Sequence, residues 1–168
     1  MKEIALISDN HSYFGDDIKD AVAGCDEVWH AGDVGDIKSI EYFLNNFECR
    51  GVYGNIDDRL VRDIFPETLF FECEGLHIYM KHIGGYPGRY NTKALQDIKS
   101  FSPDLFISGH SHILKVMRDE KLDLIHLNPG SYGLHGFHQV RTILKFSVDQ
   151  GKIKNVRIVE LGLRGSNN

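Results

Sequence analysis

Five short apolar segments of this 168-residue chain each end in a glycine, a carboxylate, an amide or an imidazole. The first, Ile4–Ile7, is apolar at every position, as expected of a strand that is buried on both faces. Similar runs precede Gly32 and Gly54, and between them Asp36 is followed by apolar residues at helical spacing up to Phe47. This β-α-β-α-β opening predicts a parallel sheet with helices against its faces.

The second half of the chain is richer in strands than in helices. Two apolar runs separated by a Glu-Gly pair predict a hairpin, and the glycine-rich stretch 83–91 predicts a loop before a helix that Asn91 or Thr92 caps. The expected strands cover residues 4–7, 28–31, 49–53, 69–73, 76–80, 105–108, 114–118, 122–127, 142–148 and 153–161. The expected helices cover residues 16–25, with Asp16 or Asp17 as the cap, 37–47 and 92–99. We therefore expect one domain over residues 1–164, with helices outside mixed sheets, and a disordered tail at 165–168.

Composition and charge argue against several classes of protein. The net charge of −5 provides no basic excess for binding duplex nucleic acid, although a local metal charge can still hold a small phosphorylated substrate. Cys25, Cys49 and Cys73 show no CxxC spacing, which fits buried thiols better than disulfides or a cysteine zinc site. The N-terminal apolar run spans four residues and no stretch approaches the length of a membrane helix, so we expect a cytoplasmic protein without a membrane partner.

Seven potential metal ligands lie at the ends of the five apolar segments. They are Asp9, His11, Asp33, Asn55, His82, His110 and His112. Ligands of open α/β sheets bind outside the carboxyl ends of the strands, and side chains two residues apart on an extended chain share a face. Taken singly, each has a structural explanation: a turn with a helix cap at Asp9, a left-handed turn at Asn55, a satisfied buried histidine at His82. Taken together, they predict a metal site with room for two ions.

Other side chains carry weaker signals. His30 is expected to pack behind the site. His135 and His138 belong to a loop that can approach the mouth of the site, where they either contact a substrate phosphate or stay solvated. Arg59 and Arg62 either reach a phosphate or are charges on a helix surface.

The order of these motifs, D-x-H, G-D, G-N, H and G-H-x-H, resembles the calcineurin-like metallophosphoesterases, and within them the small bacterial and archaeal phosphodiesterase branch. The resemblance runs from Ile4 to about Ser131 and includes an Asn-Pro-Gly-Ser turn. It implies an α/β fold, a four-layer α/β/β/α sandwich with mixed sheets around two metals. It also implies the ligands: Asp9, His11, Asp33 and His112 for one ion, and Asn55, His82 and His110 for the other, with Asp33 bridging.

The function implied by the resemblance is hydrolysis of a small phosphate ester, most readily a diester. Two ions lower the pKa of a bridging water, so that hydroxide attacks in line, and they neutralise charge on the phosphate. The expected catalytic residues are Asp33, Asn55 and Asp57, the last of which would orient His11 or His82. Mixed oxygen and nitrogen ligands favour two divalent ions of Mn, with Fe, Zn or Ni as alternatives, over Ca or Mg.

Two features leave alternatives open. Isoleucine stands at position 56, where many relatives carry a histidine that serves as acid or phosphate contact, and isoleucine cannot donate a proton. Ser12 and Tyr132–His135 also depart from the family pattern, so the resemblance carries over the metal site but not the substrate contacts. The rival function is a non-catalytic, protein-binding scaffold of the same fold, as in a retromer subunit with an incomplete site. A nuclease is the rival among the enzymes, and a homodimer or larger oligomer stays open.

Overall fold

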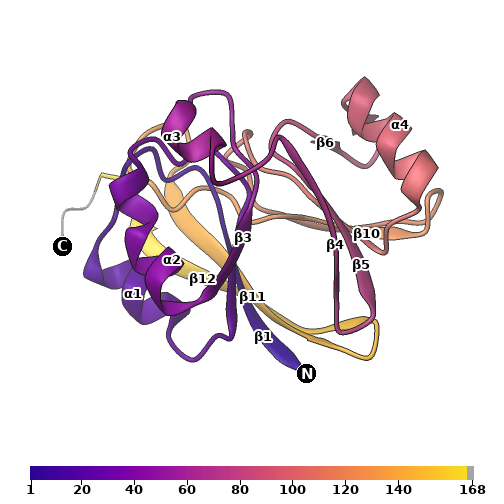
Figure 1. The fold of residues 1–168 in the computed structure, drawn as a ribbon, viewed down its shortest axis with the longest axis horizontal. Helices are drawn as coiled ribbons and strands as arrows, with labels where there is room; N and C mark the ends of the chain where they lie inside the picture. Colours follow the sequence, from indigo (N-terminus) through magenta and orange to yellow (C-terminus); the bar gives the residue numbers. More distant parts are fainter. Residues whose placement is uncertain (166–168) are drawn as a thin grey trace.

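Two five-stranded sheets packed face to face form the centre of the molecule, with helices on both outer sides (Figure 1). The structure is a computed structural model that describes residues 1–165. The first sheet has the order β12-β11-β1-β2-β3, with the bounds Lys152–Leu163, Val140–Asp149, Lys2–Ile7, Glu27–His30 and Glu48–Gly51. The second has the order β4-β5-β8-β10-β9, with the bounds Thr68–Cys73, Leu76–Lys81, Leu105–Ile107, Leu124–Asn128 and Lys115–Asp119. The helical elements are α1 (Asp16–Val22), η1 (Ile37–Ile40), α2 (Glu41–Asn46), α3 (Arg59–Arg62) and α4 (Thr92–Phe101).

Both sheets combine parallel and antiparallel pairs. Strands β1, β2 and β3 are parallel, which confirms the predicted β-α-β-α-β opening, and β11 joins β1 antiparallel. Strands β4 and β5 form the predicted hairpin, in which Glu74 and Gly75 have φ of 49° and 80° and so make the left-handed turn that matches strand twist. Strands β5, β8 and β10 are parallel, so their carboxyl ends reach one edge of the second sheet.

Alternating side chains on β1 and β2 build two of the three apolar layers. Leu6 and Trp29 point inward and pack against the second sheet, where the ring of Trp29 meets Phe71 at 4.9 Å. Ile7 and Val28 point outward and pack under α1, α2 and α3. Helix α4 covers the opposite face of the second sheet. The order of layers is therefore α/β/β/α, as expected.

Three local expectations differ from the structure. Gly15, not Asp16 or Asp17, is the N-cap of α1, because the Asp17 carboxylate accepts hydrogen bonds from Tyr13 and Ile18 instead. The helix after Asp36 begins as the 3-10 turn η1 before it continues as α2. Residues 83–91, which were expected to form a loop, contain two short paired strands.

Two short strands form a ribbon within residues 83–91. Strands β6 (Gly85–Tyr86) and β7 (Arg89–Tyr90) pair antiparallel, and Gly88 has a φ of 85° in the turn between them. Strands of two residues leave no periodic signal, so the sequence shows only the turn. The tail expected at 165–168 lies, from residue 166 onward, outside the described residues. No helix within residues 1–165 has both the length and the apolar character needed to cross a bilayer.

Two buried histidines make the fold sensitive to acid. Burial, with a contribution from the charge of Lys115, lowers the pKa of His126 to about 4, and burial lowers the pKa of His30 to about 3. The unfolded chain binds these protons near pH 6.5, so the stability due to a neutral imidazole is complete above that pH and is lost as the pH falls. We expect the free energy of unfolding to fall by up to about 1.4 kcal/mol per pH unit for each histidine between pH 6.5 and 4.

Urea unfolding at half-unit steps from pH 7 to pH 4 measures this slope. The variant His126→Gln should show a shallower acid slope whatever its stability at pH 7, because one buried titrating group is gone. The control His77→Gln changes a histidine whose side chain is 68% exposed and should keep the wild-type slope. Equal slopes in all three proteins would contradict the assignment of part of the acid sensitivity to His126.

Candidate metal centre

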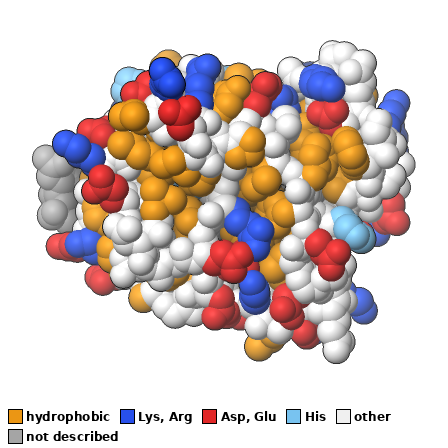
Figure 2. Space-filling view, in the orientation of Figure 1, with side chains coloured by type: hydrophobic (Ala, Val, Ile, Leu, Met, Phe, Trp, Pro, Cys, Tyr) orange, Lys and Arg blue, Asp and Glu red, His pale blue; other side chains and the backbone are white. Residues whose placement is uncertain are grey.

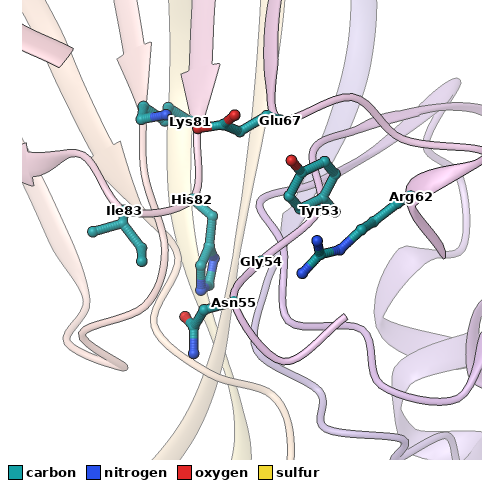
Figure 3. Close-up of a pocket in the computed structure, with 8 residues that line it drawn as sticks. All are labelled: Tyr53, Gly54, Asn55, Arg62, Glu67, Lys81, His82 and Ile83. Carbon is teal, nitrogen blue, oxygen red and sulfur yellow. Dashed lines mark hydrogen bonds and ion pairs between the residues drawn. The ribbon is translucent and has the colours of Figure 1, made fainter. Parts of the chain in front are cut away.

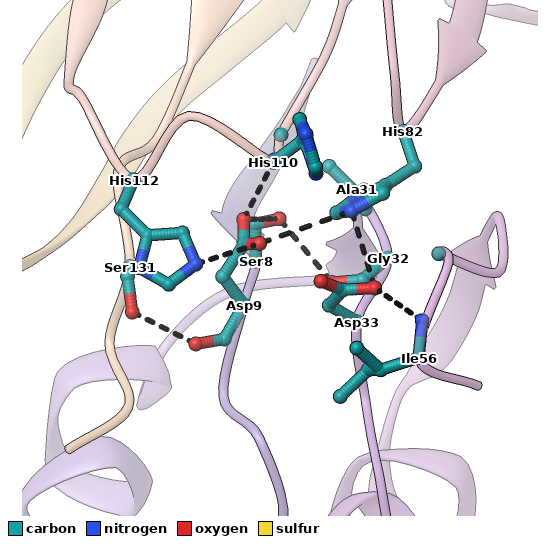
Figure 4. Close-up of polar contacts among 12 residues, drawn as sticks. Ser8, Asp9, Ala31, Gly32, Asp33, Ile56, His82, His110, His112 and Ser131 are labelled. Carbon is teal, nitrogen blue, oxygen red and sulfur yellow. Dashed lines mark hydrogen bonds and ion pairs between the residues drawn. The ribbon is translucent and has the colours of Figure 1, made fainter. Parts of the chain in front are cut away.

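The predicted ligands meet at one edge of the molecule because they follow strands whose carboxyl ends point the same way. Asp9 follows β1 and Asp33 follows β2, both in the first sheet. His82 directly follows β5, and His110 follows β8, both in the second sheet. Figure 4 shows the side chains from the two sheets facing one another across the gap between the strand ends.

Strained backbone marks the same positions. Positive φ values between 46° and 68° occur at five of the seven predicted ligands: Asp9, His11, Asp33, His110 and His112. Residues other than glycine rarely adopt this region, and such strain concentrates at functional sites, where the surrounding structure holds it in place. The backbone therefore turns sharply after β1, β2 and β8, and these turns aim the side chains at a common point.

The first half of the site consists of Asp9, His11 and His112. One ligand atom from each lies within 4.8 Å of the other two. The Oδ1 atom of Asp9 is 3.2 Å from Nε2 of His112, and Nε2 of His112 is 3.3 Å from Nε2 of His11.

The second half consists of Asp33, His82 and His110, whose ligand atoms also lie within 4.8 Å of one another. The two oxygens of Asp33 face different halves of the site. Oδ1 is 3.2 Å from Nε2 of His82, whereas Oδ2 is 3.8 Å from Nε2 of His11. The Asp33 carboxylate therefore lies between the two groups of candidate ligands, which is the geometry that a bridging role requires.

Hydrogen bonds fix which nitrogen of His82 and of His112 faces the site. Nδ1 of His82 donates to the carbonyl of Ala31 at 2.7 Å, so its Nε2 carries the lone pair. Nε2 of His138 donates to the carbonyl of Gly133 at 2.9 Å, so its Nδ1 accepts from Nδ1 of His112 at 3.2 Å. The Nε2 of His112 therefore also faces inward with a lone pair.

These inward lone pairs fit a cation. When the ring of His82 is neutral, its Nε2 is buried without a hydrogen-bond partner among residues 1–165, and so is Oδ1 of Asp9. A buried nitrogen lone pair 3.2 Å from a carboxylate oxygen is repulsive unless a proton or a metal ion lies between them. The donor set of carboxylate oxygens and imidazole nitrogens suits a divalent transition metal.

Protons and metal ions compete for this site. Burial opposes a charged imidazole at His82, but the hydrogen bond with Asp33 and the charge of Asp9 outweigh it and raise the pKa. Burial likewise opposes ionisation of Asp33, but the hydrogen bond and charge of His82 lower its pKa. A metal ion would displace the proton that this pairing favours, so metal affinity should fall as the pH is lowered.

Glycines in the predicted motifs let the chain approach the ligands closely. A Cβ atom on Gly54 would lie 2.0 Å from Oδ1 of Asp33, and one on Gly32 would lie 2.6 Å from Nδ1 of His82. No side chain larger than a hydrogen fits either gap without moving a ligand. The G-D and G-N pairs are therefore explained by packing against the ligands as well as by turn geometry.

Asn55 and Asp57 play different parts in the geometry. Asn55 is exposed and lies beside His82 (Figure 3). Asp57 was expected to orient His11 or His82, but it binds neither of them. Its two oxygens accept the backbone N–H groups of Gly54 at 2.7 Å and Gly35 at 2.8 Å, because the tight turn points those amides at the carboxylate. Asp57 therefore holds the loop that brings Asn55 to the site.

Backbone and hydroxyl groups that the sequence analysis missed support the carboxylates. Oδ2 of Asp9 accepts from the Ser8 hydroxyl and from the backbone N–H of His110, the latter at 3.1 Å. The backbone N–H of Ile56 donates to Oδ1 of Asp33 at 3.1 Å. The hydroxyl of Ser131 donates to the carbonyl of Asp9 at 2.8 Å. The Asn-Pro-Gly-Ser turn is a sequence signal that could have identified Ser131. A backbone N–H donor leaves no signal in the sequence.

His30 packs behind the site, as the sequence analysis expected. Its Nδ1 accepts from the backbone N–H of Gly32 at 3.1 Å, and its Nε2 donates to Oδ1 of Asn10 at 2.9 Å. These bonds need a neutral ring, consistent with its lowered pKa. His30 ties the turn after β2 to the turn after β1.

The site opens into a cavity of about 450 Å³. Its walls include ligands from both halves together with the exposed side chains of Ile56, His135 and Phe137. The ring of His135 lies 5.1 Å from that of His11, so this loop residue does reach the mouth. The loop that carries His135 and His138 covers one side of the site.

Comparisons with known proteins agree with this geometry. The family description that matches the sequence, over residues 1–151, is the calcineurin-like phosphoesterase superfamily domain. No curated protein matches the chain significantly in sequence. A solved archaeal phosphodiesterase superposes with a TM-score of 0.73 at 22% identity, covering 94% of this chain and 99% of that one.

Two further solved structures share the fold. A predicted phosphoesterase from Streptococcus pneumoniae has a TM-score of 0.67 at 23% identity, covering 95% of this chain and 90% of its own. Vps29 from Entamoeba histolytica, complexed with zinc, has a TM-score of 0.71 at 17% identity, covering 95% and 99%. At these identities the likeness establishes the fold. Together with the match over residues 1–151, it shows that this chain belongs to the calcineurin-like phosphoesterase superfamily.

Proposed function

We propose that this protein is a phosphodiesterase that uses two divalent metal ions. The observation that carries the proposal is the position of Asp33, whose two oxygens face two separate groups of ligand atoms. Asp9, His11, Asp33 and His112 would hold one ion, and Asp33, Asn55, His82 and His110 the other. Such a pair supplies a hydroxide nucleophile near neutral pH and neutralises charge on the phosphate oxygens.

The protein's own residues position the groups of the site. The backbone amide of Ile56 holds the carboxylate of Asp33 in one orientation. Asp57 fixes the turn that presents Asn55, whose exposed amide lies beside His82. The phosphate of an ester bound in this cavity would lie toward His110 and Asn55, both of which line the wall. These groups need not rearrange when the substrate binds.

The leaving group distinguishes this site from that of many relatives. The side chain of Ile56 is 45% exposed and lines the cavity where a histidine would stand in the G-N-H pattern. It offers an apolar surface and no proton. We therefore propose that diesters with a good, apolar leaving group, such as an aryl oxide, are cleaved fastest.

Metal analysis and a paired assay test the proposal. Protein loaded with Mn²⁺ should contain two ions per chain and should hydrolyse bis(p-nitrophenyl) phosphate faster than p-nitrophenyl phosphate, and chelation with EDTA should abolish both activities. A preparation that retains less than one ion per chain and shows no turnover would instead favour the protein-binding scaffold, the function of the same fold that needs no reaction.

Introducing a proton donor at position 56 should change the dependence on the leaving group. In Ile56→His, we expect turnover of diphenyl phosphate, whose two leaving groups are both the more basic phenoxide, to rise about tenfold or more, because general acid catalysis contributes most when the leaving group is basic. Turnover of bis(p-nitrophenyl) phosphate should change little. Ile56→Gln, which has a similar volume and no acid, is the control. An equal effect on both classes of ester would contradict this account of Ile56.

A further inference from the structure

A second cavity, of about 300 Å³, adjoins the metal centre beneath the β6–β7 ribbon. It shares His110 and Ser111 with the main cavity, so the two spaces meet at the G-H-x-H motif. Its other walls come from the ribbon, from the start of β9 and from the end of β10. A ligand that fills both cavities would place one end at the metals and the other under the ribbon.

The charge in this second cavity is positive and unpaired. Arg89 and Lys115 line it, and neither has a carboxylate partner among residues 1–165; no acidic side chain lines it at all. The ammonium of Lys115 lies 4.4 Å from the centre of the Tyr86 ring, a contact that holds the cation without neutralising it. On the face that Figure 2 shows, acidic and basic side chains are interspersed.

A hydroxyl donor stands where the two cavities meet. Oγ of Ser111 accepts from Nδ2 of Asn128 and from the backbone N–H of Ile113, both at 3.2 Å. Both of its accepting positions are occupied, so its hydrogen is free to donate to a ligand oxygen. Donors and positive charge without acceptors are the chemistry of an anion site.

The ribbon wall is held rigidly. A Cβ on Gly84 would lie 2.2 Å from the Phe106 ring, so the ribbon packs directly on the sheet there. The carbonyl of Gly85 accepts from the hydroxyl of Ser108 at 3.1 Å. Tyr86 and Arg89 are therefore presented from a fixed support, which lowers the ordering cost of binding.

The cavity on the other side of the metal centre, about 290 Å³ in volume, has different chemistry (Figure 3). Its Lys81 is neutralised by Glu67 at 2.8 Å. Its Arg62 donates to the carbonyl of Asp57 at 2.7 Å and lies over the Tyr53 ring. An anion placed there would meet the carboxylate of Glu67, so the cavity under the ribbon is the better anion site.

We propose that the cavity under the ribbon binds a second phosphate group of the substrate, through Arg89, Lys115 and the Ser111 hydroxyl. This inference rests on the proposed function: the natural substrate is then a phosphodiester that carries a further phosphate, separated from the scissile one by a spacer of roughly nucleoside size.

Equilibrium binding tests the site independently of turnover. Thymidine 3′,5′-bisphosphate and thymidine 5′-phosphate differ by one phosphate and can be titrated calorimetrically into the Mn²⁺-loaded and the EDTA-treated protein at 0.15 M salt. We expect the bisphosphate to bind about tenfold tighter or more, as a charge-assisted contact provides. In the double variant Arg89→Met/Lys115→Met the ratio of the two affinities should fall to within about twofold of one.

The control variant is Lys152→Met, which removes an exposed lysine at the turn between β11 and β12, at the opposite end of the strands. It should keep the wild-type ratio. A ratio that is the same in the wild type and the double variant would overturn the second-phosphate site, even if the protein hydrolyses bis(p-nitrophenyl) phosphate. A protein that shows the expected ratio but no metal-dependent hydrolysis would overturn the proposed reaction and leave the anion site in place.

Discussion

Replacing Asp33 with asparagine should lower kcat/KM for bis(p-nitrophenyl) phosphate by a factor on the order of a thousand, because several kcal/mol of transition-state stabilisation depend on the metal pair. The variant should also lose at least one ion per chain. Asparagine has the same shape, and its Oδ1 can still accept from the backbone N–H of Ile56. Its amide then turns an N–H donor toward His11, where the native Oδ2 lies 3.8 Å from the ring nitrogen.

The fold of the variant should survive because the substitution conserves volume at a buried position. The matched control is Asp36→Asn, three residues away. Asp36 is exposed and accepts from the backbone N–H of Lys38 as the N-cap of η1, a role that asparagine fills equally well. The control should keep both ions and full activity. An Asp33→Asn protein with two ions and more than a tenth of wild-type activity would contradict the bridging role.

The sequence predicts the parts of the fold that periodicity and turn chemistry determine locally. The apolar run Ile4–Ile7 and the stripe after Asp36 identify strand and helix because burial on one or both faces imposes a pattern on consecutive residues. The strand ends then place the ligands, because parallel strands deliver their carboxyl ends to the same edge. The convergence of Asp9, Asp33 and His82 follows from that topology without knowledge of any contact.

The sequence does not predict contacts that depend on where a loop travels. Asp57 binds backbone amides instead of a histidine, because the turn at Gly54 is tighter than the motif reveals. The β6–β7 ribbon depends on backbone pairs and on packing against Phe106, neither of which has a periodic signature. His138 meets His112 across 26 residues of chain, at an approach that requires Gly136 with a φ of 126°. Such contacts depend on the tertiary structure, so the local sequence does not predict them.

The contact between His138 and His112 predicts that position 138 has a large effect on metal binding. Burial lowers the pKa of His138, so its ring is neutral and its Nδ1 accepts the Nδ1–H of His112. His138 therefore acts as a positioning residue that keeps Nε2 of His112 turned toward Asp9. Removing it in His138→Ala should weaken binding of the first metal ion by about 10- to 100-fold, the usual effect of losing a hydrogen-bond partner behind a ligand.

His138→Asn supplies the matched comparison, because its Oδ1 can take the place of Nδ1 as acceptor. It should recover most of the metal affinity that alanine loses, as measured by competitive titration of Zn²⁺ against a chromogenic chelator. His135→Ala removes a neighbouring ring that contacts His11 without holding its tautomer, and should have a smaller effect. If alanine and asparagine at position 138 weaken binding equally, the loss is one of loop packing, and the orientation of His112 is fixed by the strained backbone at its φ of 57° instead.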